Sequence, residues 1–252
     1  MRFGETVKLT DPGLVISRRH DAWVVLHDAH PRYTQRALDF AYLQLTARDR
    51  VRKGTVSASS LGECERYQQF VYLGLPKLPP DAKNAAKMQN GSFMHLRWQM
   101  EGLSEGWLEE AEVPIGTNGY GLSRTMDGLV YEGSVLELKS TNMNGFRRVQ
   151  SFGPLLPHLF QMATYLLATR RGKGIFIYEC KDNQEYLEIP LDRDELPLTE
   201  AEAVARRVHH NIREQTLAEP LGNCIDRTGW VYHSCPFRDR CLHFHEWNEV
   251  QE

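Results

Sequence analysis

The chain contains 252 residues, of which 41% are apolar and 25% charged, so it is long enough for one sizeable core and has the composition of a globular protein. It lacks an apolar stretch long enough to span a membrane and a signal-peptide run, which predicts a cytoplasmic protein without membrane contact. The net charge of −3 gives no overall attraction for nucleic acid, so such a partner would need a local basic groove.

Residues 1–56 carry no motif and are predicted to form an N-terminal extension to a domain that covers 57–252. Two short strands, LVIS and AWVVLH, are expected around a polar RRHD turn, followed by a helix over 33–47. The basic run at 47–53 is expected to be exposed, either as a solvated linker or as a contact with a DNA backbone.

The next segment predicts a helix that follows Ser60. Ser60 and Glu63 have the spacing of a capping box, and Gly74 marks the end of the helix. Cys64 would lie in the first turn, where the helix dipole lowers the pKa of a thiol and makes it a better metal ligand.

A longer helix is predicted over 82–99, and a strand over 107–116 leads from it towards a hairpin. His95 on this helix is either a packing residue or, if the helix borders acidic side chains, a ligand for Mn²⁺ or Mg²⁺. Glu112 on the strand is either an exposed residue or a further acidic neighbour of that site.

The hairpin covers SRTMDGLVYEGSVLELKST and its turn decides which side chains meet. A three-residue loop, with Gly133 in the left-handed conformation, pairs Leu129 with Val135. The same register, continued along both strands, pairs Asp127 with Glu137. A two-residue loop would instead place these carboxylates on opposite faces.

Side chains alternate along a strand, so this register gathers Asp127, Glu137 and Lys139 on one face. The other face is predicted to be apolar and to contain Met126, Val130, Leu136 and Leu138. Two adjacent carboxylates repel unless a cation lies between them, and hard oxygen ligands, with the Leu138 carbonyl as a further one, suit Mg²⁺ or Mn²⁺. Lys139 would then orient water or stabilise charge on a phosphate. A surface hairpin with a Glu–Lys pair is the alternative.

Beyond the hairpin, a Gly- and Pro-punctuated loop at 142–157 places Arg147 and Arg148 side by side. These two arginines, with Lys173 further along, are candidates for a groove that guides a DNA strand. The helix expected at 157–172 carries Gln161 and Tyr165, which are four positions apart and therefore lie on one face.

A strand pair over 174–191 and a helix over 199–218 complete the predicted core elements. Cys180, in the first of these strands, is predicted to be a buried core residue. The tail GNCIDRTGWVYHSCPFRDRCLHFHEW then places Cys224, Cys235 and Cys241 within eighteen residues. A Cys-dense loop of this kind rarely folds without a ligand, and five cysteines in an intracellular chain favour metal or redox chemistry over disulfides.

The candidate site residues occur along the chain in the order His95, Asp127, Glu137, Leu138, Lys139, Gln161 and Tyr165. This order resembles that of the PD-(D/E)xK nuclease superfamily, and more narrowly its RecB-like branch with an iron-sulfur cluster. CRISPR-associated adaptation exonucleases and related phage and AddB-type nucleases belong to that branch. Its members hold a 4Fe-4S cluster with one cysteine ahead of the nuclease core and three after it, a layout that Cys64 and the three tail cysteines follow.

The resemblance implies a role for each of these residues. The divalent ion, Mg²⁺ or Mn²⁺, would be bound by His95, Asp127, Glu137 and the Leu138 carbonyl. Lys139 would be the catalytic lysine, and Gln161 with Tyr165 would support the site and the substrate.

The tail departs from the family at one cysteine. The last three family cysteines usually run as C-x2-C-x5-C, and Cys235 with Cys241 keeps the five-residue gap, whereas ten residues separate Cys224 from Cys235. Four thiolates hold either zinc or an iron-sulfur cluster, and a zinc site of mixed ligands would draw on His233, His243 or His245. The layout favours the cluster, which would close the long loop between Cys64 and the tail.

Together these patterns predict an α/β fold of the restriction-endonuclease type, with a central mixed sheet flanked by helices and a Cys-rich tail tied to the Cys64 helix by a metal cluster. The predicted function is a metal-dependent deoxyribonuclease, an exonuclease on single-stranded DNA ends with 5′-to-3′ polarity as one option, in recombination, repair or phage DNA processing. A non-catalytic DNA-binding subunit and a zinc-stabilised interaction module are the alternatives. A homo-oligomer or a recombination-protein partner is left open.

Overall fold

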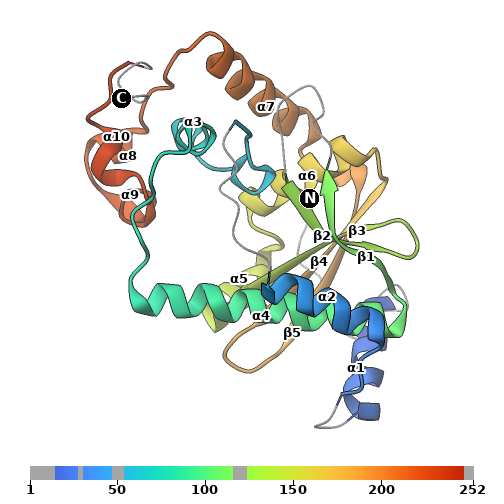
Figure 1. The fold of residues 1–252 in the computed structure, drawn as a ribbon. Coiled ribbons are helices and arrows are strands. Elements are labelled where there is room, and N and C mark those ends of the chain that lie inside the picture. The colour runs from blue at the N-terminus through green and yellow to red at the C-terminus, as the bar shows by residue number, and fades with distance from the viewer. Residues whose placement is uncertain (1–14, 28–30, 47–53, 116–123, 247–252) are drawn as a thin grey trace.

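A mixed five-stranded sheet lies at the centre of the computed structural model, which describes residues 15–27, 31–46, 54–115 and 124–246 (Figure 1). The strands are β1 (Leu108–Ile115), β2 (Arg124–Val130), β3 (Val135–Thr141), β4 (Lys173–Cys180) and β5 (Tyr186–Asp192). They follow one another in that order across the sheet; β3 and β4 are parallel, and all other neighbours are antiparallel. Helices flank this sheet, so the predicted fold class is confirmed.

The turn between β2 and β3 is the predicted three-residue loop. Gly133 has a φ of 83°, its amide donates to the Val130 carbonyl at 2.7 Å, and Leu129 lies opposite Val135. The paired residues end at Gly128 and Leu136. In a continued ladder the Leu138 amide would face the β2 backbone, but here it donates to the Asp127 carboxylate at 2.6 Å. The two strands therefore diverge at Asp127.

The predicted alternation of side chains fails at Met126. The prediction placed Met126 on the face of Val130 and Leu136, but it packs instead in the core cluster that contains Leu129 and Val135. On its other side β2 stays paired with β1 here, with Met126 opposite Val113.

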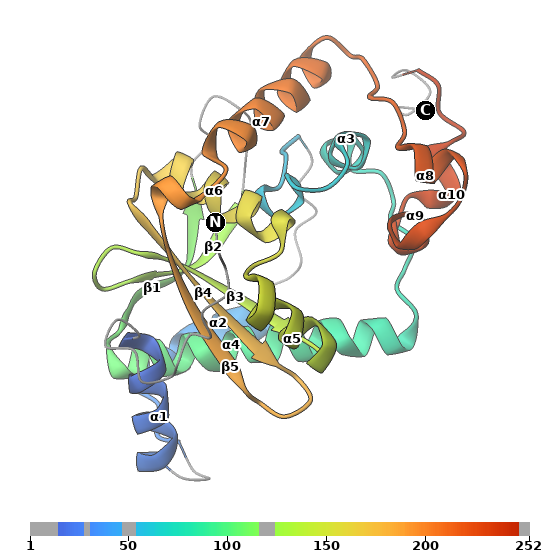
Figure 2. The same cartoon turned by 180° about the vertical axis from the view of Figure 1, so that it is seen from behind.

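Helices α1 (Val15–His27), α2 (Gln35–Thr46) and α4 (Ala82–Glu105) cover one face of the sheet (Figures 1 and 2). The core on this side includes Ile16, Trp98, Leu136, Leu138, Ile175 and Ile177. Helix α4 runs six residues past its predicted end, through the buried Gly102, and Gly106 caps it with a φ of 72°. The predicted division of the chain after residue 56 stays a prediction.

The prediction of two strands within 14–27 is wrong, because this segment forms α1. Its buried side chains include Ile16, His20 and Trp23, a helical spacing that the polar RRHD run obscured. Glu188 on β5 accepts the backbone N–H groups of Ile16 and Ser17 at 3.3 and 2.6 Å, which satisfies the start of the helix. Tertiary contacts therefore set the conformation here.

Helices α6 (Leu156–Thr169) and α7 (Leu198–Arg213) and the short η1 (Ala58–Ser60) cover the other face. The core on this side includes Leu129, Val135, Met162, Tyr165, Phe176 and Val208. Helix α7 ends five residues before its predicted end. Short η2 (Arg193–Glu195) precedes it.

The predicted loop at 142–157 is also wrong, since it contains helix α5 (Met143–Phe152). Asn142 caps the helix by accepting the Gly145 N–H at 2.9 Å, and Gly153 ends it with a φ of 76°. The glycines and the asparagine that indicated a loop are the end signals of this helix.

The tail forms three short helices, α8 (Gly222–Ile225), α9 (Gly229–Ser234) and α10 (Arg238–Cys241), beside α3 (Glu65–Leu73) (Figure 2). The predicted capping box at Ser60 is wrong, because Cys64 itself caps α3 and its sulfur accepts the Tyr67 N–H at 3.3 Å. Gly74 ends α3 with a φ of 70°, as predicted. Within the described ranges, no helix is both long enough and apolar enough to span a bilayer.

Candidate active site

The divergence of β2 and β3 creates a polar site between α4 and α6. Asp127 comes from β2, Glu137 and Lys139 come from β3, and His95 reaches them from α4. The His95 Nδ1 lies 3.3 Å from Asp127 Oδ1, and the Lys139 Nζ lies 2.5 Å from Glu137 Oε1. Gly91 allows the close approach of α4, because a Cβ there would lie 3.0 Å from the Ser140 hydroxyl.

Asp127 is held as a carboxylate. Burial alone would raise its pKa, but His95, Lys139 and the Leu138 amide outweigh that effect and lower the pKa below its usual range. Burial would likewise favour a neutral His95 ring, yet the attraction to Asp127 raises the pKa of His95. Both shifts favour the charged forms of these two side chains, whose Nδ1 and Oδ1 atoms are 3.3 Å apart.

Glu137 is 1% exposed, and only one of its two carboxylate oxygens has a polar partner within the described residues. Its Oε1 contacts Lys139, but its Oε2 is buried without a hydrogen-bond partner among the described residues. Burial, together with repulsion from Asp127, raises the pKa of Glu137 to about 7. A buried carboxylate oxygen without a partner is costly, and this one is placed to accept a cation.

Lys139 is fixed by side chains from α6. Its Nζ donates to Gln161 Oε1 at 2.8 Å, and Gln161 Nε2 contacts the Tyr165 hydroxyl at 2.7 Å. That hydroxyl donates to the Thr125 carbonyl at 3.2 Å, which ties the chain of contacts back to β2. The structure thus brings Gln161 and Tyr165 to the lysine that they were predicted to support.

A second support lies behind Asp127, and only part of it was predicted. Gln99 Nε2 donates to the Asp127 carbonyl at 2.8 Å and to Glu112 Oε1 at 3.0 Å, and the Thr125 hydroxyl donates to Glu112 Oε2 at 2.8 Å. Glu112 has a φ of 52° between Ala111 and Val113, which pair with Gly128 and Met126 of β2. Gln99 lies four residues after His95, and this spacing on one helix face was the available signal.

His158 on α6 is another neighbour of the site that was not predicted as a site residue. Its Nδ1 lies 2.6 Å from the hydroxyl of Tyr178, the residue beside Lys139 on β4. Burial, reinforced by the charge of Lys139, lowers the pKa of His158 to about 3. This imidazole is therefore neutral near pH 7 and serves as a hydrogen-bonding group.

The predicted DNA-binding residues do not form one group. Arg147 and Arg148 are exposed on α5, which follows the end of β3 that carries Lys139. Lys173 is exposed at the start of β4, beside Asp192, at the opposite end of the sheet. The basic run at 47–53 lies outside the described residues.

A divalent cation fits this site by donor type and by burial. Two carboxylates and an imidazole are ligands that Mg²⁺ or Mn²⁺ accepts, and Glu137 Oε2 has no partner in the described part of the chain. As these side chains stand, no set of three or more His, Cys, Asp or Glu residues within the described ranges is arranged to hold a metal ion. Binding would therefore replace the contacts that His95 and Lys139 now make.

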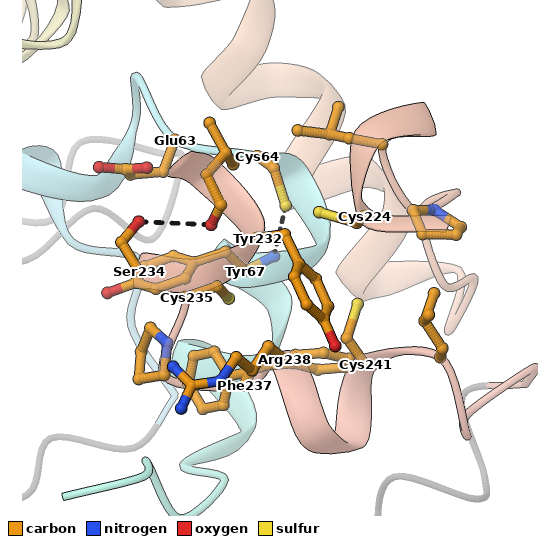
Figure 3. Close-up of a pocket in the computed structure, with 16 residues that line it drawn as sticks. Glu63, Cys64, Tyr67, Cys224, Tyr232, Ser234, Cys235, Phe237, Arg238 and Cys241 are labelled. Carbon is orange, nitrogen blue, oxygen red and sulfur yellow. Dashed lines mark hydrogen bonds between the residues drawn. The ribbon is translucent and has the colours of Figure 1, made fainter. Parts of the chain in front are cut away.

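The four cysteines of the predicted cluster line a single cavity of about 200 Å³ between α3 and the tail (Figure 3). The thiols of Cys64 and Cys224 are turned towards one another there, and Cys235 and Cys241 lie on the same cavity. Burial raises the pKa of all four thiols, that of Cys64 to about 11. The Tyr67 N–H at the start of α3 lowers the pKa of Cys64, as predicted for a helix start, but burial outweighs it, so the predicted net lowering does not occur. Cys180 is fully buried in β4, as predicted.

The alternative histidine ligands do not line this cavity. His233, His243 and His245 are all exposed, whereas Cys224 is buried on the cavity wall. The wide spacing between Cys224 and Cys235 is taken up by α8 and α9, which return the chain to the cavity.

Packing against α3 also holds the tail. Phe237 packs edge-on against Phe70 and Tyr67, with ring centroids 5.4 and 5.3 Å apart. Gln69 exchanges two hydrogen bonds with the chain ahead of the tail, to the Thr216 carbonyl at 2.7 Å and from the Ala218 N–H at 2.8 Å. The cavity is therefore built on one fixed helix.

The raised pKa of Glu137 predicts that metal affinity depends on pH. A cation must displace the Glu137 proton, so the affinity for Mn²⁺ should increase from about pH 6 to about pH 8, with measurable proton release in calorimetry. In the metal-free protein the folded pKa exceeds the unfolded one. The stability that this proton contributes is therefore lost as the pH rises from about 4.5 to about 7. Glu137→Gln should abolish both trends, and a Mn²⁺ affinity that is flat with pH in the parent would contradict the prediction.

Comparison with known proteins places the fold. No family model and no curated protein matches the sequence. The fold is similar to the crystal structure of the alkaline exonuclease LHK-Exo from Laribacter hongkongensis, with a TM-score of 0.51 and 19% identity over 65% of this chain and 90% of that one. The complex of LHK-Exo with dAMP gives a TM-score of 0.51, 20% identity and coverages of 64% and 89%. The crystal structure of SSO0001 gives a TM-score of 0.48 and 21% identity, with 81% of this chain and 93% of that chain covered. The chain is thus similar in fold to an alkaline exonuclease.

Proposed function

We propose that this protein is a divalent-metal-dependent deoxyribonuclease of the PD-(D/E)xK type that acts as an exonuclease on single-stranded DNA ends. The observation that carries the proposal is the half-satisfied Glu137, buried beside Asp127 and next to Lys139. These residues stand where two strands of the sheet diverge, in a fold that resembles an alkaline exonuclease.

In this proposal His95, Asp127, Glu137 and the Leu138 carbonyl hold Mg²⁺ or Mn²⁺. The bound ion would supply a polarised phosphate and a water of lowered pKa. Lys139, held by Gln161, stabilises the negative charge that develops on the phosphate and orients the attacking water. Tyr165 keeps Gln161 in the rotamer that this requires.

The alternatives fit fewer of these observations. A non-catalytic DNA-binding subunit has no need of an unpartnered buried carboxylate beside an oriented lysine, and both are present here. A zinc-stabilised interaction module accounts for the cysteines but leaves the site between α4 and α6 without a role.

For the tail we propose a 4Fe-4S cluster bound by Cys64, Cys224, Cys235 and Cys241. Support comes from the shared cavity of about 200 Å³, which all four cysteines line. Thiolates that share one zinc must converge on it at about 2.3 Å, whereas a cluster separates them.

The proposed activity is tested by digestion of end-labelled DNA. Linear single-stranded DNA should be digested with Mg²⁺ or Mn²⁺ and left intact with EDTA, and circular single-stranded DNA should resist because it has no end. Comparison of 5′ and 3′ labels gives the polarity. Digestion that persists in EDTA, or rapid cutting of the circle, would contradict the proposal.

Arg147 and Arg148 give a separate prediction on DNA binding. Affinity for single-stranded DNA should fall steeply with salt, and Arg147→Ala combined with Arg148→Ala should flatten the slope of log K against log [salt] by about one to two units. Fluorescence anisotropy at four salt concentrations measures that slope. An unchanged slope would place the phosphate contacts elsewhere on the molecule.

A further inference from the structure

Helix α4 borders a large hollow that the proposed chemistry leaves unused. This cavity of about 650 Å³ lies between α2 and α4. Leu45, Met88 and Phe93 form its apolar wall, and His95 and Gln99 connect it to the candidate active site. Its size and its apolar wall with a few polar groups are those of a ligand pocket.

The three side chains of the apolar wall are exposed. Phe93 is 60% exposed, Met88 64% and Leu45 63%. These side chains, from α2 and α4, form an exposed apolar patch. Exposed side chains contribute little to the stability of the fold, and patches of this kind mark binding surfaces. The patch adjoins His95, so its occupant would lie directly beside the proposed metal ligands.

A second hollow of about 420 Å³ lies between α4 and residues of the sheet side, Ser140 on β3 and Lys181 after β4. It shares Met88 and His95 with the first and adds Lys87 and Lys181, together with Ser140 next to the catalytic Lys139. Lys181 donates to the Lys87 carbonyl at 3.2 Å, so the two lysines lie together. Within the described residues neither ammonium group has a carboxylate partner, which leaves two positive charges at the edge of the site.

We propose that these two hollows bind an unpaired nucleotide next to the scissile phosphate. The base would stack on Phe93 against Met88 and Leu45, and the phosphate would contact Lys87 and Lys181. An apolar wall beside a basic one matches the two chemically different halves of a nucleotide. A base inserted here is not paired, which would give the nuclease its preference for single strands. The inference deepens the proposed function and rests on it.

The charges favour this occupant over a protein surface. A protein that bound the apolar wall would gain little binding free energy from Lys87 and Lys181, which have no carboxylate partner within the described residues and lie beside the site of Asp127 and Glu137. A nucleic-acid strand carries one phosphate for each base. When one of its bases occupies the apolar wall, its phosphates can therefore reach Lys87, Lys181 and the candidate active site. Because His95 lines both hollows and also belongs to the candidate active site, we favour a nucleic-acid strand over a protein partner.

Stacking is tested with 2-aminopurine at the end of a single-stranded oligonucleotide, in a Lys139→Ala background that removes cleavage. Phe93→Ala should weaken binding about tenfold and abolish the quenching of the fluorescent base, since stacking on an aromatic side chain is lost. Phe93→Trp should restore both. Tyr131→Ala is the matched control, because Tyr131 is an aromatic residue 76% exposed in the turn between β2 and β3 and lines neither hollow.

The lysines are tested by the salt dependence of the same binding. Lys87→Ala with Lys181→Ala should reduce the slope of log K against log [salt] by about one to two units, whereas Lys83→Ala, which removes an exposed charge from the first turn of α4, should leave it unchanged.

Two results would overturn this inference. One is a Phe93→Ala variant with parental affinity and quenching; the other is a Phe93→Ala variant that alters the oligomeric state in sedimentation but not DNA binding. The proposed function fails separately, if the parent protein digests no DNA. A parent that digests DNA, combined with an unaffected Phe93→Ala variant, refutes the base site alone.

Discussion

Replacing Glu137 with Gln is expected to lower the rate of DNA digestion by about a thousandfold or more. The substitution keeps the volume of the side chain but removes the charge that binds the cation and pairs with Lys139. Single-turnover kinetics would give the rate, and calorimetry with Mn²⁺ would give the accompanying loss of metal affinity.

Glu132→Gln provides the matched control, because Glu132 is exposed in the turn of the same hairpin. It should digest DNA at the parental rate. A Glu137→Gln variant that stays within about tenfold of the parent would show that this carboxylate is not the metal ligand of the reaction.

Replacing Cys64 with Ser is expected to have the largest effect on stability. The anaerobically purified parent should be brown, because sulfur-to-iron charge transfer gives a broad visible absorption. The variant should be colourless, and its Tm should fall by about 10 °C or more, since a bound metal contributes several kcal/mol to folding. Cys224→Ser should behave in the same way, because Cys224 is buried on the same cavity.

Cys180→Ala is the control for this series. Cys180 is fully buried in β4 and lines no part of the cavity, so its loss should cost about 1 kcal/mol and leave the colour unchanged. A colourless parent with stoichiometric zinc would contradict the cluster. A Cys224→Ser variant with full colour would remove Cys224 from the ligand set.

The hairpin could be predicted because its register follows from local rules. The loop ending at Gly133 admits a left-handed residue, and this fixed Leu129 opposite Val135. The predicted pairing of Asp127 with Glu137 does not form, because the ladder ends at Gly128 and Leu136. The divergence of the strands could not be predicted, because it depends on the Asp127 carboxylate taking the Leu138 amide, and no local pattern encodes that choice.

Two helices were missed for different physical reasons. Helix α1 owes its conformation to contacts with Glu188 and Glu101, which lie far away in the sequence. In α5 the signals were local but ambiguous, since Asn142 and Gly153 are typical both of a loop and of the two ends of a short helix.

The candidate site was predictable where its residues are consecutive or helically spaced, as with Gln161 and Tyr165. The binding surface was not, because its members come from separate elements. Lys87 and Lys181 meet only through the packing of α4 against the loop after β4, whereas the adjacent Arg147 and Arg148 were conspicuous in the sequence and lie on another helix.

The most direct test compares the parent with Lys139→Ala, purified side by side, on 5′-labelled linear single-stranded DNA with Mn²⁺. The account predicts that the parent digests the DNA and that Lys139→Ala, though folded and able to bind DNA, does not. Equal digestion by both proteins, or digestion by neither, would contradict it.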